Sequence, residues 1–360
     1  MQLIKLKKNK LISIIMPVHN GGQFLDYSVK SILNQSYKSF ELLIIDDNST
    51  DNTLEIIKKY QFDKRVRVYS FKKKVGIVKC LNHGLQKSMG FYVARMDADD
   101  YSFSERFKKQ VFFLKENPKI SLVGSQARYF GKINFFSKLV FSDYNDCKSL
   151  IIFRNPLIHP SIMIKKNELK KLGGYKNSHK SEDYLLWSIF LEKYNGANIK
   201  ENLIKYRIHD FQNGKDNLEK KKSILKIQKK WIKKLINTNR NLIFKKHYEL
   251  SILNENFPKI KNFNKINSYY QWLLILKKNN EKKKIFKISS FNKILNLYSI
   301  CLCISFSDHG LIAYKKYKSI KLYSNSLFID IILISVCALK IKNFYLKKVL
   351  WYVTQVLLIK

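Results

Sequence analysis

The first hundred residues alternate between strand-like runs and segments with helical spacing. The runs cover residues 11–18, 40–45, 66–71 and 91–96, and the first two are apolar at almost every position. Strands of that composition are covered on both faces, as in parallel sheets flanked by helices. The order strand, helix, strand, helix therefore predicts an α/β fold, with a mostly parallel central sheet and helices on both of its faces.

Polar clusters follow three of the predicted strands. They lie at residues 19–20, 46–47 and 97–100. In open α/β sheets, ligands bind outside the carboxyl ends of the strands. Because these clusters share one edge of the predicted sheet, we expect them to line a single binding site.

The third cluster contains Asp97, Asp99 and Asp100. In an extended chain Asp97 and Asp99 point to the same side, because side chains alternate with a period of two. Two carboxylates on one side suit a hard divalent cation, Mg²⁺ or Mn²⁺, which would in turn hold a diphosphate. The alternative is a solvated acidic turn before the next helix, and we interpret Asp100 as such a helix-start residue.

The pattern becomes mixed after residue 100. Helical spacing recurs at residues 106–114, and a strongly apolar helix opens at 181–187. Strand-like pieces lie at residues 121–128, 158–164 and 204–209. These elements extend the α/β region to about residue 214.

From residue 215 the chain carries Lys-rich helical stretches and two apolar runs, at 294–306 and 327–339. Neither run reaches the roughly 18–20 residues that span a bilayer. Cationic, aromatic-rich helices that are too short to span are typical of segments lying on a membrane surface. The alternative is a helical domain that packs both runs internally. We predict two domains, 1–214 and 215–360, with the second a candidate for association with an anionic membrane.

The formal net charge of the chain is +41, and it is unevenly distributed. Residues 215–360 carry 31 Lys and Arg against 7 Asp and Glu. Such a field favours polyanions, namely nucleic acid, anionic lipid or lipid-linked phosphates, although drift in base composition would also enrich lysine. No nucleic-acid recognition module is visible, so we expect no nucleic-acid partner. Five cysteines without metal-ligand spacing indicate a reducing, cytoplasmic compartment.

Several motifs, read together and in order, resemble glycosyltransferase family 2, whose members have the GT-A fold. The resemblance covers roughly residues 10–214. It rests on residues 14–20, 44–51, 94–100 followed by Arg106, 155–161, 173–175 before 182–184, and 206–209.

The resemblance implies a nucleotide pocket formed by the first two clusters. Pro17, Val18 and Asn20 would border this pocket. Asp47 would accept a hydrogen bond from a uracil ring, with Asp46 as its neighbour.

The resemblance also implies the residues that carry the chemistry. Asp99 would bind the metal, and Asp97 would face the ribose or the water shell of the metal. Asp183 would be the general base of an inverting reaction, in which a carboxylate takes the proton of the acceptor hydroxyl. Lys79 would contact the nucleotide, and His209 the diphosphate or the metal.

The function implied is metal-dependent transfer of a hexose or N-acetylhexosamine from a nucleotide-sugar, such as a UDP-sugar. The acceptor would be a saccharide or a lipid-linked saccharide of lipopolysaccharide or capsule, at the inner face of the cytoplasmic membrane. Processive synthases of the family carry Gln-x-x-Arg-Trp. Here Gln228 and Trp231 are one residue too close, so we expect single-sugar transfer. The alternatives are a basic nucleic-acid-binding protein and a catalytically inactive scaffold of the same fold.

Overall fold

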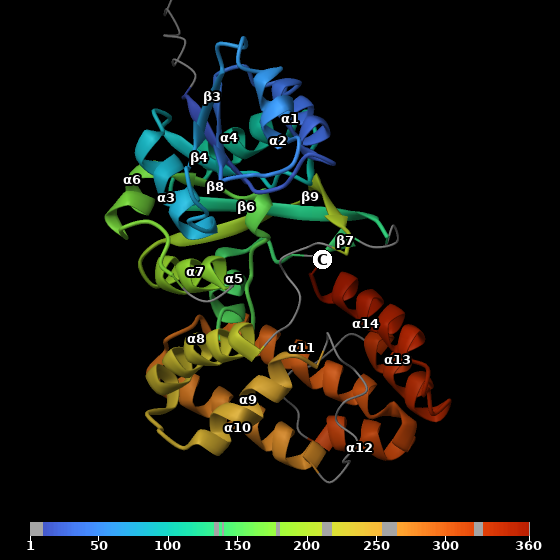
Figure 1. The fold of residues 1–360 in the computed structure, drawn as a ribbon. Coiled ribbons are helices and arrows are strands. Elements are labelled where there is room, and N and C mark those ends of the chain that lie inside the picture. The colour runs from blue at the N-terminus through green and yellow to red at the C-terminus, as the bar shows by residue number, and fades with distance from the viewer. Residues whose placement is uncertain are drawn as a thin grey trace, which may run out of the picture. The chain divides into compact units, whose positions relative to one another are not determined.

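The computed structural model describes residues 10–132, 137–138, 140–177, 181–210, 218–253, 265–319 and 327–359. The chain divides into two compact units (Figure 1). The first, called the sheet unit, comprises Met1–Tyr144 and Leu157–Asn217. The second, called the helical unit, comprises Asn145–Pro156 and Leu218–Lys360.

The sheet unit is built on a nine-stranded sheet. Its strands are β1 (Ile12–Val18), β2 (Phe40–Asp46), β3 (Val66–Ser70), β4 (Tyr92–Arg95), β5 (Tyr101–Ser102), β6 (Ile120–Gly131), β7 (Ser137–Lys138), β8 (Met163–Lys165) and β9 (Asn195–Ile208). They follow the order β3-β2-β1-β4-β8-β6-β9-β5, and β7 pairs with β6. Strands β3, β2, β1 and β4 are mutually parallel, as is the pair β6 and β9. The predicted α/β fold class is confirmed.

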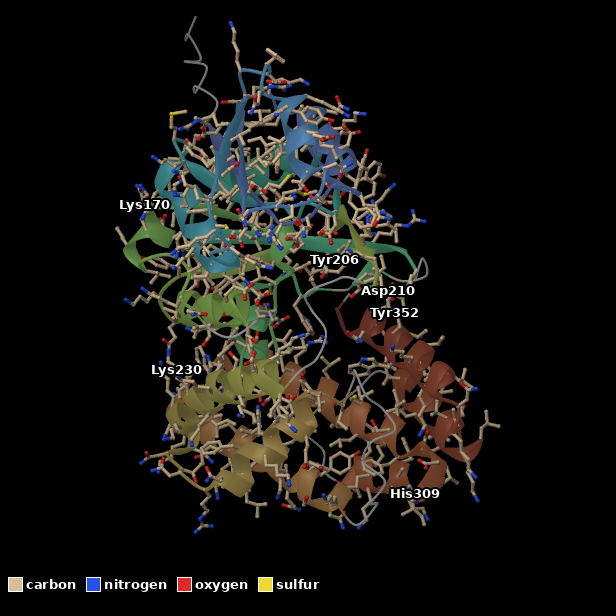
Figure 2. The ribbon with its side chains drawn as sticks, viewed as in Figure 1. Lys170, Tyr206, Asp210, Lys230, His309 and Tyr352 are labelled. Carbon is tan, nitrogen blue, oxygen red and sulfur yellow. The ribbon has the colours of Figure 1, made fainter. Side chains whose placement is uncertain are left out.

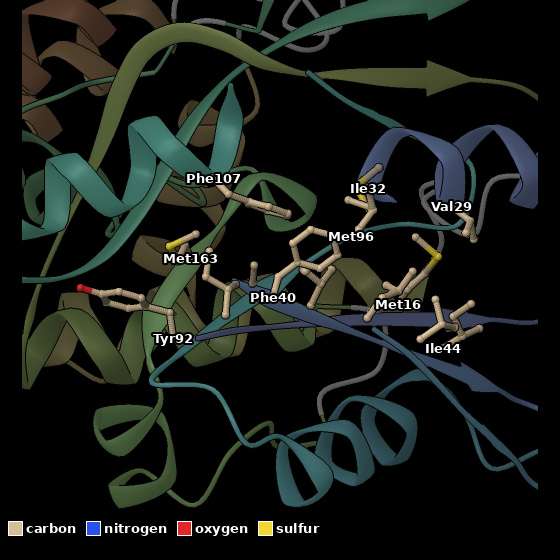
Figure 3. Close-up of a cluster of buried hydrophobic side chains, with 14 of the residues drawn as sticks. Met16, Val29, Ile32, Phe40, Ile44, Tyr92, Met96, Phe107 and Met163 are labelled. Atoms are coloured by element: carbon tan, nitrogen blue, oxygen red, sulfur yellow. The ribbon is translucent and has the colours of Figure 1, made fainter. Parts of the chain in front are cut away.

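Helices cover both faces of the sheet, because its central strands carry apolar side chains on both faces. Met16 of β1 and Ile44 of β2 belong to the cluster that also contains Val29 of α1 (Figure 3). On the other face α3 packs so closely on β1 that a Cβ atom at Gly84 would lie 2.5 Å from Ile15 Cγ2. The helices of the unit are α1 (Leu25–Leu33), α2 (Thr53–Lys58), α3 (Ile77–Lys87), α4 (Arg106–Glu116), α6 (Lys166–Lys171) and α7 (Glu182–Lys193).

The strand predicted at residues 158–164 is only partly formed. A 3-10 turn, His159–Ser161, occupies its first half, and β8 begins at Met163. Pro160 explains the break, because proline has no N–H to donate to a neighbouring strand. Strand β8 runs antiparallel to both β4 and β6, so it separates the parallel strands β3 to β4 from the pair β6 and β9.

The helical unit packs around α11, which is buried along most of its length from Ser290 to Ser305. Its helices are α8 (Leu218–Ile236), α9 (Asn241–Ser251), α10 (Ile266–Lys283), α11 (Ile288–Ser305), α12 (Leu311–Ser319), α13 (Leu327–Ala338) and α14 (Phe344–Ile359). Among the described residues, α11 alone is long and apolar enough to cross a membrane, and 78% of it is buried. The helix that contains most of the run at 294–306 is thus longer than the run itself and reaches the length that was predicted to be missing, but it packs internally rather than on a surface.

A short segment of the chain, Asn145–Pro156, groups with the helical unit, and helix α5 (Tyr144–Leu150) forms its first half. The ring of Phe153 stacks on His247, with ring centroids 4.8 Å apart, and on Tyr298, at 4.1 Å. Asp146 pairs with Lys293 at 2.9 Å. These contacts explain why this segment belongs with helices that come much later in the sequence.

Candidate active site

Hydrogen bonds join the loops after β1 and β2 at the carboxyl edge of the sheet. Strands β1 and β2 pair with Val18 opposite Asp46, so the loops that follow them leave the sheet at the same level. Nδ1 of His19 lies 2.9 Å from the carbonyl oxygen of Asp47. Asn20 Oδ1 accepts a hydrogen bond of 2.8 Å from the backbone N–H of Thr50. The first two polar clusters therefore share one edge.

The carboxylate of Asp47 orders the loop that leads into α3. Its two oxygens accept hydrogen bonds from the backbone N–H groups of Val75, at 2.6 Å, and Gly76, at 2.9 Å. Gly76 has a φ of 86°, a conformation that favours glycine. Lys79 follows on α3 and is exposed, whereas Asp46 and Asp47 are buried. A contact of these residues with a nucleotide stays a prediction.

Three carboxylates meet in the turn between β4 and β5. Asp97, Asp99 and Asp100 each place one oxygen within 4.8 Å of the others. Asp97 and Asp99 are half-buried, and Asp100 is fully buried. Like charges this close repel one another unless protons, cations or hydrogen-bond donors compensate them.

The end of β9 supplies donors to this turn. Nε of Arg207 donates a 2.7 Å hydrogen bond to the backbone oxygen of Asp99, and the backbone N–H of Arg207 donates one of 2.8 Å to Oδ1 of Asp100. Nε2 of His209 lies 2.8 Å from Oδ2 of Asp99. Tyr206, labelled in Figure 2, lies on the same strand. The predicted acids and His209 are thus brought together.

The guanidinium of Arg207 is held between two aromatic rings. Its central carbon lies 4.2 Å from the ring centroid of Phe24 and 4.3 Å from that of Phe130. Phe24 also lies beside the imidazole of His209, with centroids 5.0 Å apart. Stacking on both faces restricts the guanidinium, so its hydrogen bond to the acidic turn has a defined direction.

The interpretation of Asp100 as a helix-start residue was wrong. Its side chain is 1% exposed and points into the protein, where Arg207 binds one carboxylate oxygen. The other oxygen, Oδ2, is buried and has no hydrogen-bond partner among the residues that the structure describes. Burial, with the charges of Asp97 and Asp99, raises the pKa of Asp100 well above its ordinary value.

Asp97 pairs with Arg95, the residue two positions before it. Arg95 is buried at the end of β4, so its charge is compensated inside the protein. Burial raises the pKa of Asp97, Arg95 opposes that rise, and the carboxylates of Asp99 and Asp183 add to it.

Helix α7 brings two further acids to the same region. Glu182 and Asp183 occupy its first turn, where carboxylates complement the positive end of the helix. Burial raises the pKa of Glu182 to about 7, with Asp183 and, more weakly, Asp97 contributing to the rise. Asp97 and Asp183 therefore belong to one electrostatic group, although they are far apart in sequence.

His159 has a structural environment. Its Nε2 lies 3.1 Å from the hydroxyl of Tyr175, and its ring packs edge-on against Trp187. Burial lowers the pKa of His159 well below its ordinary value, and the nearby charge of Arg95 adds to this. The neutral imidazole therefore packs the 3-10 turn before β8 against the segment that precedes α7 and against α7 itself.

Residues 13–172 match the family model for glycosyl transferase family 2. The O-antigen biosynthesis glycosyltransferase WbnJ of Escherichia coli is 34% identical over 209 residues, which are 56% of this chain and 80% of WbnJ. The chain belongs to glycosyltransferase family 2. It is therefore a glycosyltransferase, as the sequence motifs predicted.

Solved structures show the same fold at low sequence identity. A fragment of S. aureus TarS, in complex with UDP-GlcNAc, superimposes with a TM-score of 0.56 at 15% identity and covers 87% of this transferase and 90% of the fragment. The mannosyltransferase PcManGT of Pyrobaculum calidifontis, in complex with GDP-Man and Mn²⁺, superimposes with a TM-score of 0.51 at 12% identity. The match covers 97% of this transferase and 88% of the PcManGT chain. The GT-A fold of the transferase is confirmed.

The acidic turn has the donor set of a hard divalent cation. Three carboxylates converge, and one buried oxygen, Asp100 Oδ2, lacks a partner among the described residues. Oxygen-only ligands suit Mg²⁺ and Mn²⁺, and a cation would offset the like charges that raise the pKa of Asp97 and Asp100. The residues therefore fit such an ion.

Two arginines of this site received no role from the sequence. Arg207 lies within the motif at residues 206–209, two positions before His209. Nothing else in the sequence indicated that it belongs to the site. Arg106 is fully buried under the acidic turn, and its Nη2 donates a 2.8 Å hydrogen bond to the backbone oxygen of Arg95. Its place in the family motif was visible in the sequence, but its burial was not.

Proposed function

We propose that the transferase moves one sugar from a UDP-sugar to a saccharide or lipid-linked saccharide, with inversion at the anomeric carbon. The observation that carries this proposal is the convergence of three carboxylates in the turn from Asp97 to Asp100, with Asp183 of α7 close enough to raise the pKa of Asp97. Inverting transfer needs a charge-neutralising site for the diphosphate and a separate carboxylate for the acceptor. The UDP-GlcNAc complex of TarS supports a UDP-sugar donor.

In this proposal the donor lies along the edge formed by β1, β2 and β4. Pro17, Val18, Asn20, Asp46, Asp47 and Lys79 border the nucleoside. Asp99, with Asp97 beside it, would hold Mg²⁺ or Mn²⁺, and His209 is the further diphosphate or metal contact. The metal, when bound, supplies a Lewis acid that neutralises charge on the leaving diphosphate. The Mn²⁺ complex of PcManGT supports this choice of ion.

The acceptor side of the proposal rests on Asp183. Its carboxylate takes the proton from the acceptor hydroxyl as the oxygen bonds to the anomeric carbon, and the nucleoside diphosphate leaves with the electron pair of the broken bond. Burial raises the pKa of the neighbouring Glu182 to about 7, a value that suits a general base near neutral pH, so Glu182 is the alternative base and the choice of Asp183 rests on its position in the family motif. A single displacement needs no covalent nucleophile.

We further propose that the product belongs to a surface polysaccharide, lipopolysaccharide or capsule, made at the cytoplasmic face of the membrane. The O-antigen role in the name of WbnJ supports this class. Gln228 and Trp231 are both buried in α8 of the helical unit, where Gln228 donates a 2.6 Å hydrogen bond to the backbone oxygen of Phe153. Gln228 and Trp231 thus serve the packing of the helical unit rather than a motif of a processive synthase, which supports single-sugar transfer. We assign transfer to residues 1–214 and membrane association to 215–360.

The proposal is tested by a donor screen with the full chain. Release of UDP, GDP or dTDP is measured with a panel of nucleotide-sugars and oligosaccharide acceptors, in the presence of Mg²⁺ or Mn²⁺. We expect UDP release that requires acceptor and stops when a chelator is added. Release unaffected by the chelator would exclude the metal, and release of GDP or dTDP alone would exclude the UDP-sugar. A chain that releases no nucleotide with any pair would be the inactive scaffold.

A further inference from the structure

Helix α14 has its polar and apolar faces inverted. A surface helix normally buries its apolar face and exposes its polar one. Among the side chains of α14 that the structure describes, the buried ones are the polar Lys347, Thr354 and Gln355, together with Trp351. Its exposed large apolar side chains are Leu346, Val349 and Val353. These three are spaced by three and four residues, so they form one stripe on the outer face of the helix.

The orientation of α14 is determined by its polar contacts. Nζ of Lys347 donates a 2.9 Å hydrogen bond to the backbone oxygen of Ser305 at the end of α11, and it lies 3.3 Å from Oδ1 of Asp308. The hydroxyl of Thr354 bonds within the helix, to the backbone oxygen of Trp351 at 2.8 Å, so the contacts of Lys347 are the ones that fix the rotation of α14. Rotating α14 to bury its apolar stripe would separate a buried ammonium from its partners, which is costly.

Helix α13 also exposes apolar side chains. Ile331 is 51% exposed and Ile334 is 40% exposed, while Leu333 and Cys337 are fully buried on the opposite face. Leu339 follows the helix and is 74% exposed. Both α13 and α14 contact α11 (Figure 1). The two helices therefore present apolar outer faces on the same core helix.

The charge around these faces is positive. Residues 311–360 contain nine lysines and one acid, Asp330. That acid pairs with Lys318 at 2.7 Å. Lys340 and Lys342, beside Leu339 in the link from α13 to α14, are exposed, as is Lys348. Half-buried Tyr352 (Figure 2) adds an amphipathic ring of the kind found at membrane interfaces.

We propose that α13, α14 and the link between them form a docking surface for an anionic lipid bilayer. The 16 residues of α14 extend about 24 Å, less than the roughly 30 Å of a hydrocarbon core, so the helix would lie in the interface. The flanking lysines match the negative surface of anionic lipid. A second copy of this chain would instead bring like charges together. The sequence run at 327–339 pointed to α13, whereas α14 is identified by its inverted faces.

The test is co-sedimentation of the full chain with vesicles, either of phosphatidylcholine alone or of phosphatidylcholine mixed with phosphatidylglycerol. We expect binding to the mixed vesicles that weakens in high salt. Replacing the stripe, Val349→Gln with Val353→Gln, should weaken binding by at least about tenfold. Lys340→Gln with Lys342→Gln should weaken it by about fivefold per lysine.

The matched control is Leu218→Gln with Leu242→Gln, two exposed leucines of α8 and α9 that should leave binding unchanged. Equal binding by the Val349→Gln, Val353→Gln variant and the unchanged protein would overturn the proposal. So would a dimer, seen by sedimentation equilibrium, that this variant dissociates without any vesicle binding. The docking surface rests on the membrane association proposed above for residues 215–360. Transfer to a soluble acceptor is measured alongside, so that a failure of docking and a failure of the transfer reaction can be told apart.

Discussion

Nε2 of His209 lies 2.8 Å from Oδ2 of Asp99, across 110 positions of sequence. This contact connects the end of β9 to the acidic turn after β4. Arg207, two residues before His209, binds the backbone of the same aspartate. The geometry of the proposed metal site therefore depends on a strand that contributes no carboxylate to it.

We predict that His209→Ala weakens the response to metal. Groups that orient or supplement metal ligands typically change metal affinity or activity by about 10–100-fold. The transfer rate of the variant should fall by that factor at low Mn²⁺ and recover partly at high Mn²⁺. The measurement is the initial rate against metal concentration. His83→Ala, which alters a ring packed on Tyr69, is the control. A metal curve identical to that of the unchanged enzyme would contradict the assignment.

Arg207→Lys tests the positioning of the acidic turn. Lysine keeps the charge but cannot reproduce the planar guanidinium between Phe24 and Phe130. We expect transfer to fall by about ten- to a hundredfold, because small displacements of reacting groups have effects of that size. The apparent affinity for metal should fall with it, which a purely structural loss would not produce. Arg128→Lys, at an exposed site on β6, should be neutral. An unchanged metal affinity in Arg207→Lys would refute the positioning role.

Glu182 should make the protein less stable at alkaline pH. Its pKa is raised by burial from 4.5 to about 7, so its contribution to stability is complete below its unfolded pKa and is lost as the pH rises through about 7. Glu182→Gln removes this loss, worth up to about 3 kcal/mol. In thermal unfolding, the melting temperature of the variant should rise relative to that of the unchanged protein between about pH 5 and about pH 8. The exposed Glu201→Gln should show no such trend, and a parallel response of the two variants would disprove the prediction.

His247 should have the opposite effect on the acid side. Nε2 of His247 lies 2.8 Å from the backbone oxygen of Ile152, and its Nδ1 accepts a hydrogen bond from Trp272. Burial lowers the pKa of this imidazole from 6.5 to about 4, so stability present above about pH 6.5 is lost as the pH falls toward 4. The loss should reach about 3 kcal/mol.

The free energy of unfolding, measured as a function of pH, tests this effect. His247→Gln should flatten the acid limb of the curve, while His309→Gln, at an exposed histidine labelled in Figure 2, should not. An acid limb unchanged in His247→Gln would show that another group is responsible.

The sequence predicted the central strands well because their pattern is local. Strands β1 and β2 are buried on both faces, and an almost continuous apolar run is sufficient to identify them. Asp46 and Asp99 could be placed at one edge for the same reason. The antiparallel insertion of β8 was not predictable, because a three-residue strand after Pro160 carries no direction in its sequence.

Contacts between distant segments were also beyond the sequence. Asp100 was misread because its partner, Arg207, is 107 residues away. The grouping of residues 145–156 with the helical unit depends on Phe153 stacking against His247 and Tyr298. The inverted faces of α14 required knowing which side the core takes, since apolar residues occur around most of that helix.

The most direct test of the proposed reaction is the transfer rate of Asp183→Asn with saturating donor, acceptor and metal. Asparagine keeps the shape of the side chain but cannot accept the acceptor proton, so the rate should fall by about 10²–10⁴-fold. UDP affinity and thermal unfolding should be unchanged, because Asp183 contacts neither the nucleotide nor the metal in the proposal. Transfer at the full rate by Asp183→Asn would contradict the assignment of Asp183 as the base.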